Sequence, residues 1–210
     1  MPGSWEPSEL PRLTQDNHAI TSCYDTRYNC IAWAASDILR WWEPASGTHH
    51  GRPNYWPADV PKEWNVAAYA AAFATLGYVD SGNGFLEPGW EKVALFAVES
   101  GGNFSVEHAA RQLPDGTWTS KLGDCEDITH MSVTDVCCPD YGSVVRFLKR
   151  RLGGTGPPSC KTPSRPAGSN LSTANGSTSL AASHFPEADA IPALLRGDHT
   201  VAAQSKMARH

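Results

Sequence analysis

The sequence of 210 residues has no long hydrophobic run and no dense cluster of basic residues. No window approaches the roughly 18 apolar residues that a membrane-spanning helix needs, and the first residues lack the basic and then apolar regions of a secretory signal. The 17 Lys and Arg are outnumbered by 22 Asp and Glu, for a formal net charge of −5, so no basic patch favours nucleic acid or an anionic membrane. We therefore expect a cytoplasmic protein that binds neither.

What is present is enough apolar material for one core. Hydrophobic residues make up 40% of the chain and include eight Trp, which suits a single medium-sized domain. We expect that domain over residues 20–152, after a lead-in over residues 1–19. Residues 153–210 are rich in Gly, Pro, Ser, Thr, Ala and Asn, and such a segment is expected to be a disordered tail. Without a secretory signal the six cysteines are expected to be free thiols, and the protein a monomer.

Apolar periodicity predicts the secondary structure of the domain. A short apolar run over residues 91–98, bounded by Gly and polar residues, predicts a central strand covered on both faces. The Pro-Asp-Gly turn at residues 114–116 indicates a hairpin with strands over residues 106–113 and 117–122. Asn65 is placed to cap a helix. Apolar side chains at helical spacing predict helices over residues 30–42, 66–76 and 141–152.

Two groups of potential metal ligands lie in irregular segments. His49 and His50 are adjacent in a proline-rich connection, but neighbouring side chains diverge and no Cys or carboxylate lies at ligand spacing from them. Cys125 and His130 precede a pair of adjacent cysteines, and this spacing matches no usual zinc motif. We therefore predict a connecting loop in each case, and neither a metal nor another cofactor.

Cys30 lies where a polar segment changes into an apolar helical pattern, in the stretch Tyr-Asn-Cys-Ile-Ala-Trp-Ala-Ala. The free amides and positive dipole end of a helix N-terminus stabilise a thiolate, which is the reactive form of cysteine. The alternative is a small buried hydrophobic residue on an apolar helix. His108, early in the predicted hairpin, is a candidate base for such a nucleophile, or else a strand histidine without a catalytic part.

The order of these features resembles the papain-like superfamily, in particular its NlpC/P60 and CHAP branches. In those proteins a Cys that begins a helix is followed by a strand and then by a hairpin that opens with His. The stretch Pro-Gly-Trp-Glu-Lys-Val-Ala-Leu-Phe at residues 88–96, and then the stretch from His108 to Ser120, occupy these two places here. The resemblance implies an α+β fold in which N-terminal helices pack on a small antiparallel sheet.

The same resemblance implies roles for individual residues. Cys30 is then the nucleophile and His108 the base. Ser120 takes the third place, which in these families usually holds His, Asn or Gln. Asn29 or the backbone amide of Cys30 is the candidate donor to an oxyanion, which acyl transfer requires.

The geometry of the predicted hairpin decides whether Ser120 can reach and orient His108. With a loop of three residues, Ala110 faces Ser120, and His108 lies diagonal to Ser120 on the same face of the sheet. A loop of two residues would turn the neighbours of Ser120 to that face instead. Asp127 and His130, just after the hairpin, are the alternative orienting residues.

Longer blocks of sequence indicate a narrower relationship. The blocks YNCIAWAA, FATLGY, LEPGWEKVALF, HAARQLPDGTWTSKLG and YGSVVRFLKRR resemble those of a family of uncharacterised bacterial proteins. This resemblance covers about residues 20–151 and implies no established activity.

Two functions follow as expectations. The first is a thiol enzyme that uses Cys30 and His108 for hydrolysis or acyl transfer on a peptide or amide substrate. The second is a non-catalytic module that binds a peptide or protein in the same cleft. A lowered pKa of Cys30 favours the enzyme, and an inert, buried Cys30 favours the module.

Overall fold

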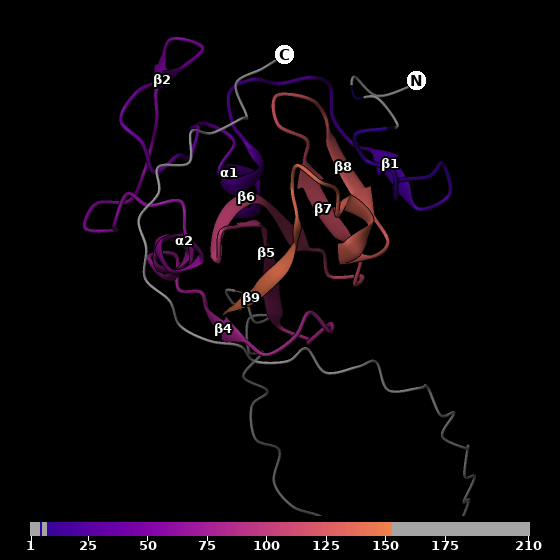
Figure 1. Cartoon of the computed structure of the whole chain (residues 1–210). Helices are drawn as coiled ribbons and strands as arrows, with labels where there is room; N and C mark the ends of the chain where they lie inside the picture. The colour runs from indigo at the N-terminus through magenta and orange to yellow at the C-terminus, as the bar shows by residue number, and fades with distance from the viewer. Residues whose placement is uncertain (1–4, 6–7, 153–210) are drawn as a thin grey trace, which may run out of the picture. The chain divides into compact units, whose positions relative to one another are not determined.

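The described part of the chain is built around one seven-stranded sheet (Figure 1). The computed structural model describes Trp5 and residues 8–152, so the predicted tail over residues 153–210 lies outside the described residues. The strand order is β1-β8-β7-β6-β5-β9-β4, and every neighbouring pair is antiparallel. The strands are β1 (His18–Ile20), β4 (Val79–Ser81), β5 (Trp90–Ser100), β6 (Asn103–Gln112), β7 (Trp118–Lys121), β8 (Asp127–His130) and β9 (Ser143–Arg151).

Short elements surround the sheet. The described residues form two α-helices, α1 (Cys30–Ala34) and α2 (Val66–Ala74), and one 3-10 turn at Val133–Val136. A separate small hairpin, β2 (Thr48–His49) and β3 (Arg52–Pro53), lies in the long connection between the two helices (Figure 1). No helix among the described residues has the length and apolar character to cross a membrane.

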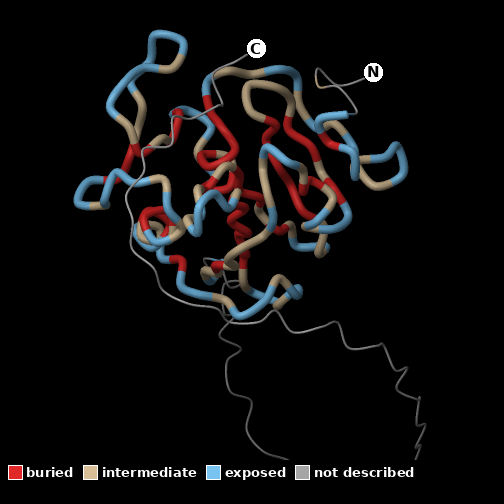
Figure 2. Tube along the Cα trace, viewed as in Figure 1, coloured by how far each residue is buried: buried red, intermediate tan, exposed pale blue. Residues whose placement is uncertain are grey.

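The sheet carries a hydrophobic cluster on each face. Side chains alternate along β5, so that Val93 and Leu95 belong to one cluster while Ala94 and Phe96 belong to the other. The first cluster lies under α1, which packs on β6 and β7, and under α2, which packs on β6 and β9. The second cluster includes Trp118, Ile128 and the residues around the 3-10 turn. Burial is accordingly concentrated in the central strands (Figure 2).

The predicted α+β, papain-like arrangement is wrong, because the domain is mostly antiparallel sheet. The predicted first helix ends early: Ser36 adopts φ 63°, and Leu39, which the apolar pattern placed on the packed face, is exposed. The predicted helix over residues 141–152 is strand β9, which pairs with β5 and β4. Its run of Val144, Val145 and Phe147 fits a pleated surface, and pairing on both edges overrides the helical spacing.

Other local predictions are confirmed. The Asn65 side chain caps α2 by accepting a hydrogen bond from the amide of Ala68 at 2.9 Å. The buried strand over residues 91–98 lies within β5, and the predicted hairpin is β6 and β7. Its register pairs Ala110 with Ser120, as the loop of three residues predicts. These are the elements in which one short stretch of sequence sets the structure.

Candidate functional site

Cys30 begins α1 and is fully buried. Its thiol points to the backbone of β6, where Sγ lies 3.9 Å from the carbonyl oxygen of Glu107. Burial raises the pKa of this thiol to about 12, even though nearby backbone groups act to lower it. A helix of five residues therefore does not activate Cys30. The thiol is protonated and shielded at neutral pH.

Asn29, the predicted oxyanion donor, is fully used in holding the chain together. Its Oδ1 caps α1 by accepting from the amide of Ala32 at 3.0 Å. Its Nδ2 donates to the carbonyl of Trp42 at 2.7 Å. Both ends of the side chain thus fix the start of α1 to the segment that follows it.

Three other predicted site residues form a buried chain of hydrogen bonds across β6, β7 and β8. The Oγ of Ser120 lies 3.0 Å from Nε2 of His108 and 3.0 Å from Nε2 of His130. The other ring nitrogen of His130, Nδ1, lies 2.8 Å from the carbonyl oxygen of Ser132. All three side chains belong to nearly inaccessible residues. The structure therefore brings together the base and two of the three candidates for the orienting residue.

The position of each proton in this series of hydrogen bonds follows from the groups that the side chains contact. Burial lowers the pKa of His108 to about 3, and burial likewise lowers the pKa of His130, so both rings are neutral at pH 7. The carbonyl of Ser132 only accepts, so Nδ1 of His130 donates and its Nε2 accepts from Ser120. The Ser120 oxygen then accepts from Nε2 of His108. The remaining nitrogen, Nδ1 of His108, is a buried acceptor with no partner among the described residues.

Cys30 does not belong to this group. It packs in the cluster under the two helices, whereas the His108 ring lies against Phe96 and Tyr141 on the opposite face of the sheet. Asp127, the other alternative, is also engaged elsewhere and accepts from the Tyr28 hydroxyl at 2.8 Å. The expected contact between Cys30 and His108 is therefore absent from this structure.

His108 pairs with Phe96 and therefore lies on the face of the sheet opposite to Cys30, and β6 then contains a β-bulge. Phe96 of β5 pairs with His108 and the next residue, Ala97, pairs with Val106, so Glu107 is an extra residue in the ladder. A bulge changes which face the following side chains take. His108 and Val106 consequently lie in different clusters despite a spacing of two.

The same bulge forms one wall of a cavity of about 200 Å³. The connection after α1 forms another part of the wall. There, Oε2 of Glu43 accepts one hydrogen bond from Nε1 of Trp41 at 3.1 Å and another from Nδ2 of Asn54 at 2.9 Å. The amide of Val106 donates to the carbonyl of Trp64 at 2.8 Å, and both residues line the cavity. The cavity is lined by Asn29, Ile31, Trp41, Trp42, Glu43, His49, Trp64, Tyr69, Val106 and Glu107.

Two carboxylates give this cavity a negative character. Burial raises the pKa of Glu107, and its hydrogen bond from Ser105 acts to lower it. The pKa of Tyr69 lies well above its usual range, chiefly through burial and further through Cys30, Glu107 and Glu43. Neither Glu43 nor Glu107 forms an ion pair with any described residue.

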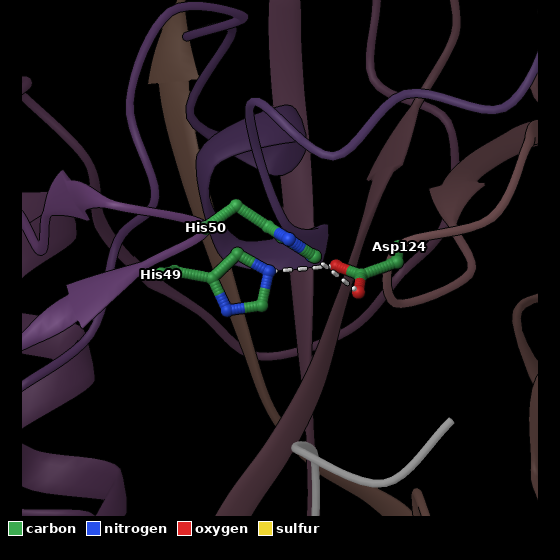
Figure 3. A group of neighbouring side chains, drawn as sticks. All are labelled: His49, His50 and Asp124. Carbon is green, nitrogen blue, oxygen red and sulfur yellow. Dashed lines mark hydrogen bonds and ion pairs between the residues drawn. The ribbon is translucent and has the colours of Figure 1, made fainter.

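A group of potential metal ligands lies at one edge of the cavity (Figure 3). His49 and His50 extend from the hairpin of β2 and β3, and Asp124 from the turn between β7 and β8. Nε2 of His49 lies 2.8 Å from Oδ1 of Asp124, and Nε2 of His50 lies 3.2 Å from Oδ2. The indole of Trp41 stacks on the His49 ring, with centroids 3.3 Å apart. The connecting loop predicted for the histidines is present, but it carries a partner that the sequence did not indicate.

Sequence patterns gave no signal for these groups. Asp124 is 75 residues from His49 and meets it only because the hairpin folds back over the sheet. Glu107 lines the cavity at a β-bulge that the sequence did not indicate. The predictions followed motifs within single stretches, whereas both groups are assembled from stretches far apart in the chain.

One family model matches the chain. It is described as a domain of unknown function, DUF7689, and it matches residues 19–149. No curated protein and no solved structure matches the chain. The prediction of an uncharacterised family is thereby confirmed, while a relationship to the papain-like superfamily has no support.

Burial predicts how the cysteines react. In native protein treated with iodoacetamide at pH 8, we expect Cys30 to be alkylated at least 100-fold more slowly than exposed Cys23, because its thiol is shielded and its pKa is raised. Peptide mapping by mass spectrometry measures both rates in one sample. We expect His108→Ala to leave the ratio unchanged. Fast labelling of Cys30 that slows in His108→Ala would restore the thiol enzyme as the better hypothesis.

Proposed function

Since the chain belongs to the DUF7689 family of domains of unknown function, we propose a function from its own geometry: the domain is a non-catalytic module that binds a peptide or protein by holding a basic side chain in the cavity. The observation that carries this proposal is the pair of carboxylates, Glu43 and Glu107, that line a cavity with aromatic walls and have no cationic partner among the described residues.

The state of Cys30 favours a binding module over a thiol enzyme. Acyl transfer needs a thiolate, a base within hydrogen-bond reach and access for the substrate. Cys30 has a raised pKa, is fully buried and lies on the other face of the sheet from His108. His108 is itself enclosed, with its hydrogen bond directed to Ser120.

Charge sets the chemistry of the ligand. A half-buried carboxylate without a cation is costly, and an incoming ammonium or guanidinium group offsets that cost through charge-assisted hydrogen bonds. Glu43 already receives two neutral donors at Oε2, which leaves Oε1 for a ligand. Glu107 lines the same cavity, and both carboxylates act on Tyr69. A basic side chain in the cavity is therefore attracted by two acidic groups.

The aromatic lining adds to this preference. Trp41, Trp42, Trp64 and Tyr69 line the cavity, and the face of an aromatic ring attracts a cation, most strongly when water is excluded. The volume of about 200 Å³ is below the 300 Å³ or so at which pockets for drug-sized ligands begin. The cavity therefore suits one side chain of a larger partner.

Peptides with a single variable residue test the proposal. We expect fluorescein-labelled Gly-Ala-X-Ala-Gly to bind when X is Arg or Lys, and about tenfold or more weakly when X is norleucine or Glu, because only a cation pairs with the carboxylates. Fluorescence polarisation with the full chain measures the affinities.

A matched pair of variants locates the binding. Glu107→Gln is expected to weaken the Arg peptide about tenfold, since it removes one charge and keeps the shape of the side chain. Glu99→Gln, on the exposed end of β5, removes the same charge from the net total and is expected to leave the affinity unchanged. Equal affinities for Arg and norleucine peptides, or equal effects of the two variants, would refute the proposal.

A further inference from the structure

We propose that His49, His50 and Asp124 form a binding site for a divalent transition metal ion of the zinc type. This goes beyond the binding of a basic side chain, because the three ligands lie at the edge of the cavity and need no peptide. Their ligand atoms all lie within 4.8 Å of one another. Figure 3 shows the two rings and the carboxylate turned toward a common point.

The spacing of the three groups suits a small ion. With bonds of about 2.0–2.2 Å, neighbouring ligand atoms of a tetrahedral zinc site lie roughly 3.3 Å apart. The imidazole nitrogens lie 2.8 Å and 3.2 Å from the Asp124 oxygens. These two nitrogen–oxygen distances are within about half an ångström of the zinc spacing, and all the ligand atoms lie within 4.8 Å of one another.

The hairpin turn brings two adjacent histidines to the same point. His50 and Gly51 form the turn between β2 and β3, with φ 45° and φ 74°. Such a turn favours Asn or Gly, because a left-handed conformation is strained for a residue with a larger side chain. His50 adopts it, and its ring consequently reaches the same carboxylate as its neighbour.

The surroundings hold the ligands in place. His49 is stacked on Trp41, and its side chain is only 16% exposed. Among the described residues, Asp124 forms its ion pairs with these two imidazoles and with no Lys or Arg. The Asp124 oxygens are thus held by two groups that are themselves metal ligands.

The ligand types define the class of metal. Two imidazole nitrogens and one carboxylate suit zinc and its neighbours, whereas Mg²⁺ and Ca²⁺ prefer all-oxygen sites. Three protein ligands leave at least one coordination position open for water or another small ligand. Because His49 also lines the cavity, a bound ion places positive charge at its edge.

Titration of the full chain with zinc and with cobalt tests this site. We expect one zinc ion per chain, with an affinity in the micromolar range or tighter, by isothermal titration calorimetry. Cobalt is expected to give a visible spectrum of nitrogen and oxygen ligation without thiolate charge-transfer bands, which separates this site from the free cysteines. Magnesium and calcium are expected not to compete.

Conservative variants identify the ligands. Asp124→Asn and His50→Gln keep the size of each side chain close to the original and are expected to weaken zinc tenfold or more. Asp16→Asn, on an exposed loop, is the matched control and is expected to have no effect, and circular dichroism checks that each variant is folded. Zinc binding that needs millimolar metal or survives Asp124→Asn, or thiolate bands in the cobalt spectrum, would overturn the proposal. The Arg peptide is measured without metal, so failure here is distinct from failure of the proposed peptide binding.

Discussion

Acidification from pH 6.5 to pH 4 is expected to lower the free energy of unfolding by about 3 kcal/mol through His108 alone. The pKa of this histidine in the folded protein is lowered to about 3, mainly by burial and also by His130. The unfolded chain takes up the proton near the ordinary pKa of about 6.5. Below that pH the unfolded state binds more protons, so stability falls with pH until the folded pKa is reached.

The environment of His108 explains why its pKa is lowered in the folded protein. The ring faces Tyr141, Phe96, Ser120 and, through Ser120, His130. None of these carries a negative charge at neutral pH that could stabilise an imidazolium. Burial lowers the pKa of His130 as well, so His130 also contributes to the loss of stability as the pH falls.

Urea unfolding at several pH values measures this effect. His108→Gln is expected to be less stable at pH 7 but to lose stability less steeply below pH 6.5, by about 1 kcal/mol per pH unit. Should His108→Gln not fold, the ¹⁵N shifts of the His108 ring in the unaltered protein decide the question. A His108 ring that titrates near pH 6.5 would contradict the account.

Zinc and a basic peptide are expected to bind antagonistically, each weakening the other about tenfold. Both sites share His49, which lines the cavity and belongs to the metal group. An ion at the edge repels a guanidinium group inside the cavity. Coupling between two sites is reciprocal, so the two factors must be equal. This effect requires both proposed sites and no change of fold.

Fluorescence polarisation with and without saturating zinc measures how much zinc changes the affinity for the Arg peptide. Calorimetry with and without the peptide measures how much the peptide changes the affinity for zinc. Asp124→Asn is expected to remove the effect of zinc while leaving the peptide affinity in the absence of metal nearly unchanged. The account fails here if zinc strengthens the binding of the Arg peptide, or if the effect persists in Asp124→Asn.

Local patterns in the sequence predicted those parts of the fold that depend on neighbouring residues. The Asn65 cap needs only the amides of the next turn, and the register of β6 and β7 follows from the length of one loop. The pairing of Ser120 with Ala110, and the reach of Ser120 to His108, followed from that register. A fold element set by one stretch was predictable.

Parts that depend on distant stretches were not predictable. Residues 143–151 have helical spacing, but β5 and β4 on either side make them a strand. The order of Cys30 and His108 along the chain gave no information on which face of the sheet α1 covers, and the His108 side chain lies on the other face. The meeting of Asp124 with the two histidines likewise depends on tertiary folding alone.

The measurement that tests the proposed function most directly is the NMR signal of the Trp41 indole N–H, which donates to Glu43 inside the cavity. Titration with the Arg peptide is expected to shift this signal and to leave the indole signal of Trp118 in place, since Trp118 belongs to the cluster on the other face of the sheet. The norleucine peptide is expected to shift neither. No shift at Trp41, or equal shifts at Trp41 and Trp118, would contradict a cavity built for a basic side chain.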